Sequence, residues 1–239
     1  MGQTERVADT KVTKKQVQQR VTHYGVPLAL SKFEWDAGTR AFSTVESKLV
    51  IDFSGISVCT FRTGSTCTFN TRYGCTFNTG MNCTFNTGYS CAFRTRDDCT
   101  FNTGPGCTFN TGRGCTFNTG DECAFYTGGG CAFTTGSDCT FLAGSECTWV
   151  IGGRRYSFAP LLIMGSQWPV NVYQPGYLKI GCQKHTFPTW DRDVGKIAQR
   201  HDASPEVLAE YMGLIKVARE WAKEKGWLVR DTTARTSAW

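Results

Sequence analysis

The sequence predicts a mainly β fold, a two-sided parallel β-solenoid with an N-terminal hairpin and cap and a small α-helical region at its C-terminal end. An eight-residue unit, best written CTFNTGxx, repeats twelve times between residues 59 and 152 without insertion or deletion. A cysteine opens every unit, an aromatic residue follows two positions later, and position six is glycine in ten of the twelve units. Such strict periodicity is typical of a solenoid, in which each coil buries its apolar face by stacking on its neighbours.

Side-chain alternation within a strand assigns an inside and an outside to the unit. Residues one, three and five of an extended strand lie on one side, and residues two and four on the other. The aromatic residue at position three must be buried, so the cysteine and the fifth-position threonine point inward with it, while the second-position threonine and the fourth-position asparagine face solvent. The predicted core consists of Cys59, Phe61, Cys67, Phe69, Cys75, Phe77, Cys83, Phe85, Phe93, Phe101, Phe109, Phe117, Phe125, Phe133, Phe141 and Trp149.

The size of one coil follows from the reach of the chain. Eight extended residues span about 26 Å, and two sheets packed about 10 Å apart use about 20 Å of that length in their turns. Two units per coil leave about 16 Å per face, enough for a five-residue strand. The sequence therefore predicts about six coils of sixteen residues, with alternate units in opposite sheets. Glycine at position six suggests a bend that needs permissive backbone angles, whereas positions seven and eight vary freely, as exposed corners do.

The first 58 residues are expected to close one end of the stack. Residues 1–30 are predicted to form a polar arm with a short helix over 11–24. Residues 31–58 contain a hairpin, because KFEW and RAFS alternate apolar and polar residues around a turn. The run LVIDFSG then serves as an atypical first coil, with Ile51 at the cysteine position and Phe53 at the phenylalanine position.

Residues 153–190 are expected to cover the other end as loops and short strands, with one strand at 177–182. The last units become apolar on their outer face, where Tyr126, Thr134 and Leu142 replace asparagine. This change predicts that the C-terminal region packs over that face.

The segment 191–226 is predicted to be helical. A short helix is expected over 193–201, and Ser204 followed by proline is a typical start for a longer helix that ends near Gly226. Residues 227–239 are expected to form a flexible tail.

Composition limits the functional classes. The net charge is +6, yet the repeat contains five arginines and six acidic residues, so the flanks carry +7. A solenoid built to imitate nucleic acid would need an acidic face, so the charge distribution argues against that role.

Thirteen cysteines suggest disulfides only in a secreted chain. With no apolar leader or membrane-length run we expect reduced thiols, with disulfide-bonded and metal-bound cysteines as alternatives.

The unit CTFNTG, preceded by KFEWD and LVIDFSG, resembles octapeptide-repeat proteins of unknown function encoded by bacteriophages and other large DNA viruses. The run YLKIGCQKHTFPTW, followed by a helical end, is similar to a terminal module of phage-encoded proteins. Together these segments cover most of the chain. The resemblance implies a viral origin and a solenoid, and it brings no catalytic residues.

Aromatic and basic side chains after the repeat are the candidate interaction residues: Trp168, Tyr173, Lys179, Lys184, His185, Trp190 and Arg192. No catalytic, cofactor-binding or metal-binding residue is predicted. Cys182 and His185 form a C-x2-H half-site, but a structural zinc ion needs four ligands and the other two histidines do not complete a recognisable spacing. Asp191 and Asp193 are expected to be N-terminal helix caps rather than an acid-base pair.

The predicted function is a non-enzymatic, phage-encoded scaffold in the host cytoplasm or the virion, whose caps bind a viral or host protein. The alternative is a counter-defence protein that binds a host immune protein or sequesters a signalling nucleotide. Two further alternatives are ice binding by the outward threonine and asparagine rows, and nucleic-acid binding by a basic helix that carries Lys216, Arg219, Lys223 and Lys225. The apolar stripe of that helix also allows a homo-oligomer, and no membrane association is expected.

Overall fold

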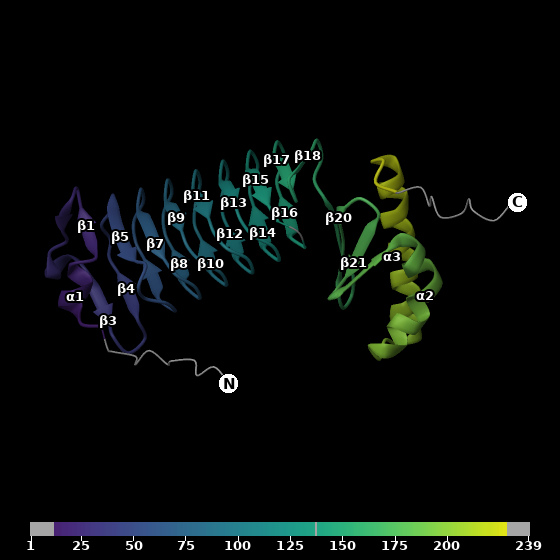
Figure 1. Ribbon diagram of the computed structural model, residues 1–239, viewed down its shortest axis with the longest axis horizontal. Coiled ribbons are helices and arrows are strands. Elements are labelled where there is room, and N and C mark those ends of the chain that lie inside the picture. Colours follow the sequence, from purple (N-terminus) through teal and green to yellow (C-terminus); the bar gives the residue numbers. More distant parts are fainter. Residues whose placement is uncertain (1–11, 137, 229–239) are drawn as a thin grey trace, which may run out of the picture.

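The computed structural model describes residues 12–136 and 138–228, and it contains a solenoid followed by a small module of sheet and helices (Figure 1). The predicted fold class is confirmed. Parallel strands sixteen residues apart stack in register, so that Phe101 pairs with Phe85 on one side and Phe117 on the other. The first eleven residues and the tail after 228 lie outside the described residues.

Two parallel sheets form the faces of the solenoid, and consecutive strands alternate between them. In sheet A the parallel strands are β5 (Leu49–Phe53), β7 (Thr68–Thr71), β9 (Thr84–Asn86), β11 (Thr100–Asn102), β13 (Thr116–Asn118), β15 (Ala132–Thr135) and β17 (Thr148–Ile151). In sheet B they are β4 (Ala41–Ser43), β6 (Thr60–Arg62), β8 (Thr76–Asn78), β10 (Ala92–Arg94), β12 (Thr108–Asn110), β14 (Ala124–Thr127) and β16 (Thr140–Ala143). Among the described residues, seven parallel strands in each sheet make seven coils, one more than the units alone predict, because β4 and β5 form a first coil.

The strands contain three or four residues within each unit, fewer than the five expected. The cysteine lies at the corner before the strand, yet its carbonyl continues the hydrogen-bond ladder, as in the 2.9 Å bond from the Thr100 amide to the Cys83 oxygen. The first coil is also shifted from the predicted alignment. Ile51 pairs with Phe69 and Phe53 with Thr71, because the loop after β5 is two residues longer than a standard corner.

Stacked phenylalanines fill the interior. Phe101 is fully buried, and its ring lies 4.9 Å from those of Phe85 and Phe117 with interplanar angles of 4°. It meets Phe93 and Phe109, from the opposite sheet, edge to face at 5.1 Å. Each interior ring therefore takes part in both offset-stacked and T-shaped pairs, the arrangements that aromatic rings prefer.

The cysteines form two columns beside the phenylalanines, and all those of the repeat except Cys147 are buried. A typical thiol donates to the position-six carbonyl of the preceding coil, as Cys107 does to Gly88 at 3.7 Å. Hydrogen bonding to the neighbouring thiol, and then burial, raises the pKa of Cys59 and Cys139. The repeat cysteines are free in the structure and, except for Cys147, pack as small groups in the core.

The corners differ from the prediction. Left-handed backbone occurs at position eight, where Thr66, Asn82 and Glu122 have φ of 59°, 57° and 58°, whereas among the described position-six glycines only Gly152 has a positive φ. A Cβ added at Gly120 would lie 2.8 Å from the backbone nitrogen of Pro105 in the preceding coil. Close approach of the coils therefore favours glycine at position six, although Arg72 and Arg96 show that two corners accept a side chain. Position eight varies in residue type but keeps the left-handed backbone in most units.

The N-terminal cap contains α1 (Lys14–Gln18), β1 (Val21–His23), β2 (Val26–Pro27), the 3-10 turn Leu30–Lys32 and β3 (Glu34–Asp36). The helix is shorter than the predicted 11–24, because β1 pairs antiparallel with β5 from Val21 onward. Strands β3 and β4 form the expected hairpin, with Trp35 opposite Phe42.

The segment after the repeat is more regular than the loops expected for 153–190. Strand β18 (Arg154–Tyr156) pairs with β17, and β19 (Leu161–Met164), β20 (Pro169–Gln174), β21 (Tyr177–Ile180) and β22 (Gln183–Thr186) then form an antiparallel sheet C. Helix α2 (Phe187–Arg200) begins six residues before the predicted start, with Thr186 as its N-cap. Helix α3 (Pro205–Glu224) begins at the expected Ser204 cap.

Sheet C does not cover the outer face of the last coils. Tyr126 and Leu142 remain 46% and 59% exposed, and the contacts of sheet C fall instead on Asp138, Cys139 and Thr140 at the end of the stack. The expectation that the C-terminal region packs over that outer face was therefore wrong. Within 12–136 and 138–228, no helix is long and apolar enough to cross a membrane.

Candidate functional site

Sheet C lies between the last coil of the solenoid and the two helices. Val170 and Val172 of β20 belong to the core beneath the helices, whereas the alternate residues Asn171 and Tyr173 face the solenoid. The Asn171 amide donates to the Cys139 carbonyl at 3.2 Å, and the Tyr173 hydroxyl donates to Asp138.

Two candidate interaction residues attach the module to the solenoid. Lys184 forms an ion pair with Asp138 at 3.4 Å, and its ammonium lies 5.2 Å from the centre of the Tyr173 ring. Burial, and then the hydrogen bond to Asp138, raises the pKa of Tyr173. Lys179 lies opposite Lys184 on the neighbouring strand. Tyr173 and Lys184 therefore have a structural role at this junction.

Two other candidates are held within the module itself. Trp190 is 2% exposed and donates from Nε1 to the Leu178 carbonyl at 2.8 Å, so it belongs to the core. Arg192 forms an ion pair with Asp193 at 2.7 Å and lowers the pKa of that carboxyl by its hydrogen bond.

An apolar cavity of about 60 Å³ lies between sheet C, the C-terminal half of α2 and the N-terminal half of α3. Trp168, Trp190 and Tyr211 form part of its wall, together with aliphatic residues of both helices. The Tyr211 hydroxyl fixes the Trp168 backbone, donating to its carbonyl at 2.8 Å and accepting from its amide at 2.6 Å. The cavity has a defined shape and room for an apolar group.

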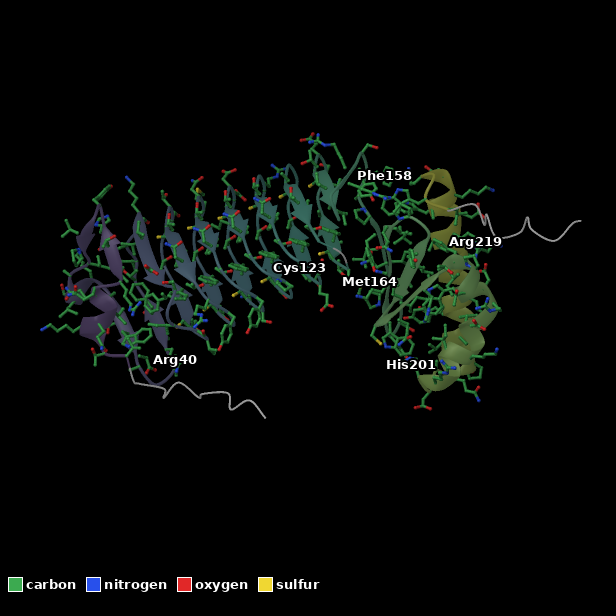
Figure 2. All side chains as sticks on the ribbon, in the orientation of Figure 1. Arg40, Cys123, Phe158, Met164, His201 and Arg219 are labelled. Atoms are coloured by element: carbon green, nitrogen blue, oxygen red, sulfur yellow. The ribbon has the colours of Figure 1, made fainter. Side chains whose placement is uncertain are left out.

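A polar groove of 240 Å³ adjoins the cavity. One wall consists of Gln183 and His185 of β22. The other consists of one stripe of α2 and its C-cap residue: Thr189, Asp193, Lys196, Ile197, Arg200 and His201. Gln183, Ile197 and His201 line both the cavity and the groove, so the two form one site. Figure 2 shows His201 at the end of the module that lies away from Phe158 and Arg219.

The groove is more basic than acidic. Lys196 and Arg200 are exposed, and the one carboxylate, Asp193, is neutralised by Arg192 at 2.7 Å and by Lys196 at 3.6 Å. The His185 ring packs edge to face against Trp190 at 5.2 Å, which fixes its position on the wall. The groove can therefore attract an anionic group beside a pocket for an apolar one.

Sequence reasoning found Trp168, His185 and Trp190 in this site but missed Lys196, Arg200 and His201. All three lie within the helix predicted over 193–201. The sequence alone did not show that this part of the chain lies opposite Gln183 and His185 of β22.

Among the described residues, no three His, Cys, Asp or Glu side chains gather where they could hold a metal ion. Cys182 lies on the cavity rim and His185 in the groove. Asp191 and Asp193 were expected to be N-terminal helix caps, but α2 begins before them and Thr186 is its N-cap. Asp191 instead pairs with Arg219 of α3.

The basic residues of α3 are partly engaged within the module. Besides its pair with Asp191, Arg219 lies 5.6 Å from the centre of the Phe187 ring, and Lys225 pairs with Glu224 at 2.8 Å. These contacts leave Lys216 and Lys223 as the exposed cations of the helix, a weaker basis for nucleic-acid binding than the sequence suggested.

The solenoid exterior is regular on one face only. On sheet A the amide of Asn86 donates to Asn70 at 2.9 Å, Asn102 to Asn86 at 2.9 Å and Asn118 to Asn102 at 3.1 Å. The equivalent column of sheet B is mixed: Arg62, Asn78, Arg94, Asn110, Tyr126 and Leu142. Comparison with known proteins adds no further assignment, since no protein-family model, curated protein or solved structure matches the chain.

Proposed function

We propose that the protein is a non-enzymatic binding scaffold encoded by a phage, in which the solenoid is a rigid spacer and the C-terminal module carries the binding site. The observation that carries this proposal is the connected cavity and groove, with Trp168 and Tyr211 on its apolar side and Lys196 and Arg200 on its polar side. Shaped apolar pockets with a few convergent polar groups are the usual form of a binding site.

The solenoid supports the spacer role through its interior. Its continuous stack of rings gives every coil the same close-packed core, and its asparagine ladder pairs polar groups within the protein. Asp138 then holds Tyr173 and Lys184 of the module against the last coil. A partner bound in the groove would be carried at a fixed end of the rod.

The test is capture of partners from phage-infected cells by the full-length chain and by two variants. Charge reversal in the groove, Lys196→Glu with Arg200→Glu, should abolish capture of a specific viral or host protein. Lys216→Glu, a charge reversal on the outer side of α3, should leave it unchanged. Equal capture by all three proteins would refute the assignment of binding to this module. Mass spectrometry of purified virions tests the virion-associated form, which an absence of the protein from them would exclude.

A second candidate, a counter-defence protein that sequesters a signalling nucleotide, is favoured by Lys196 and Arg200 in a groove that adjoins the cavity walled by Trp168 and Tyr211. Calorimetric titration of the full-length protein with cyclic di-adenylate is the direct test. Saturable binding that is lost in the Lys196→Glu, Arg200→Glu variant would support this candidate. Heat signals that are the same in that variant would refute it for this groove.

A further inference from the structure

The groove borders an open edge of a sheet. Strand β22 is the last strand of sheet C, and among the described residues it pairs only with β21. An edge strand presents unpaired backbone N–H and C=O groups, which can template the addition of another strand.

The side chains of β22 place the open edge beside the basic stripe of α2. His185 pairs with Leu178 and Gln183 with Ile180, two residues that belong to the core under the helices. Gln183 and His185 therefore point toward α2 and form the strand-side wall of the groove between the strand and the helix. A groove bounded by an edge strand and a helix is an arrangement in which an extended peptide adds as a further strand.

Charge selects the peptide. A strand added to β22 would have Lys196 and Arg200 along its helix side, with Asp193 already neutralised by Arg192. On its other side Lys184 is already paired with Asp138 of the solenoid, so it adds little charge. The cations of α2 border the added strand, so acidic side chains complement it and basic ones are repelled.

The cavity supplies the second element of recognition. It opens beside the groove at Ile197 and His201, and its walls are almost entirely apolar. The Tyr211 hydroxyl is already used by the Trp168 backbone. The polar edge of a nucleobase would therefore find few hydrogen-bond partners there, whereas an aliphatic side chain would fill the cavity without leaving a polar group unpaired.

We propose that the C-terminal module binds an acidic peptide segment, which adds as a strand to the edge of β22 and inserts one apolar side chain between α2 and α3. This assignment rests on the proposed function, because it names the partner class of the same site. Main-chain hydrogen bonds to β22 supply affinity, and the cations and the cavity supply selectivity.

The probe is a set of fluorescein-labelled octaglutamate peptides in which a single leucine is moved along the sequence. Fluorescence anisotropy with the full-length protein should show saturable binding for at least one leucine position. The octalysine series with the same leucines should not bind. The Lys196→Glu, Arg200→Glu variant should bind at least about tenfold more weakly, and the matched Lys216→Glu variant should bind as the unmodified protein does.

Strand addition is separated from simple charge attraction by N-methylating alternate amides of the best peptide. This change keeps every charge but removes main-chain donors, so affinity should fall by at least about tenfold. Hydrogen exchange should slow in residues 183–186 when the unmethylated peptide is bound. The assignment would be overturned if neither alternate set, methylated in turn, weakened binding, if no peptide of the whole set bound saturably, or if protection appeared elsewhere than in β22. If partner capture from infected cells still depends on Lys196 and Arg200 in that case, the scaffold proposal stands and only the partner class is wrong.

Discussion

Replacing Gly120 by alanine should destabilise the solenoid by about 2 to 4 kcal/mol, because the new methyl group meets backbone that cannot rotate away. The added Cβ would lie 2.8 Å from the nitrogen of Pro105 and 3.1 Å from its Cα and Cδ, about 0.6 Å closer than an ordinary contact. Two hydrogen bonds join the same coils nearby, Gly106 to Asp121 and Thr103 to Asn118, both 2.9 Å long. Moving the coils apart by that amount stretches both bonds to the limit of hydrogen bonding, at about 1 kcal/mol or more for each.

Urea unfolding followed by far-UV circular dichroism measures this loss. The matched control is Gly130→Ala at position eight, where φ is +68° and the nearest atom is 4.0 Å from the added Cβ. That variant should lose about 1 to 2 kcal/mol from left-handed strain alone. Asparagine, which tolerates this conformation, should be accepted at residue 130 but not at 120. If asparagine is accepted equally at both positions, or if Gly120→Ala is neutral, the close-approach explanation is wrong.

Four further outcomes follow from the structure, of which the first two are measured by urea unfolding. Val58→Asn should stabilise the protein by about 1 kcal/mol, because Val58 is β-branched at φ +56° and 58% exposed; an unchanged midpoint would contradict this. Phe101→Ala should cost about 3 to 5 kcal/mol, since it empties a fully buried site within the ring stacks; a loss below 1 kcal/mol would show that the stack closes the gap. Asp138→Asn should weaken the attachment of the C-terminal module to the solenoid by about 1 to 2 kcal/mol, because it impairs the bonds to Tyr173 and Lys184. Faster proteolysis after residue 153 is the readout. Because the pKa of Tyr173 is raised in the folded state, its contribution is complete below the unfolded pKa of about 10 and is lost as pH rises above it; alkaline destabilisation should therefore shrink in Tyr173→Phe.

The solenoid could be predicted because one pattern repeats in every unit. Alternation placed the phenylalanine inside, and the perimeter argument required two units per coil, which the sixteen-residue register of Phe85 with Phe101 confirms. The same reasoning did not predict why glycine occupies the corners. A glycine column indicates either positive φ or close backbone approach, and the unit alone does not show how near the preceding coil lies to Gly120.

The C-terminal module was harder to predict because sheet C is covered on both faces. In β20 the residues Val170, Asn171, Val172 and Tyr173 are all buried, so the strand lacks the polar and apolar alternation that marks a half-exposed strand. The start of α2 was missed because Thr186 is separated from Pro188 by one residue, a weaker signal than the adjacent Ser204 and proline that begin α3.

Polar groups that already bond to each other have few free donors and acceptors for a partner. The solenoid and the C-terminal module differ in this respect. The amide of Asn102 is bonded along the ladder to Asn86, and the outer surface of sheet A repeats that arrangement. The edge of β22 has no such internal partner strand among the described residues, and it adjoins the cavity and the cations of α2. This difference is why we propose recognition at this edge, while Asp138, which holds both Tyr173 and Lys184, links the edge to the rod. Variants at Asp138 should consequently change the reach of a bound partner without changing its contacts in the groove.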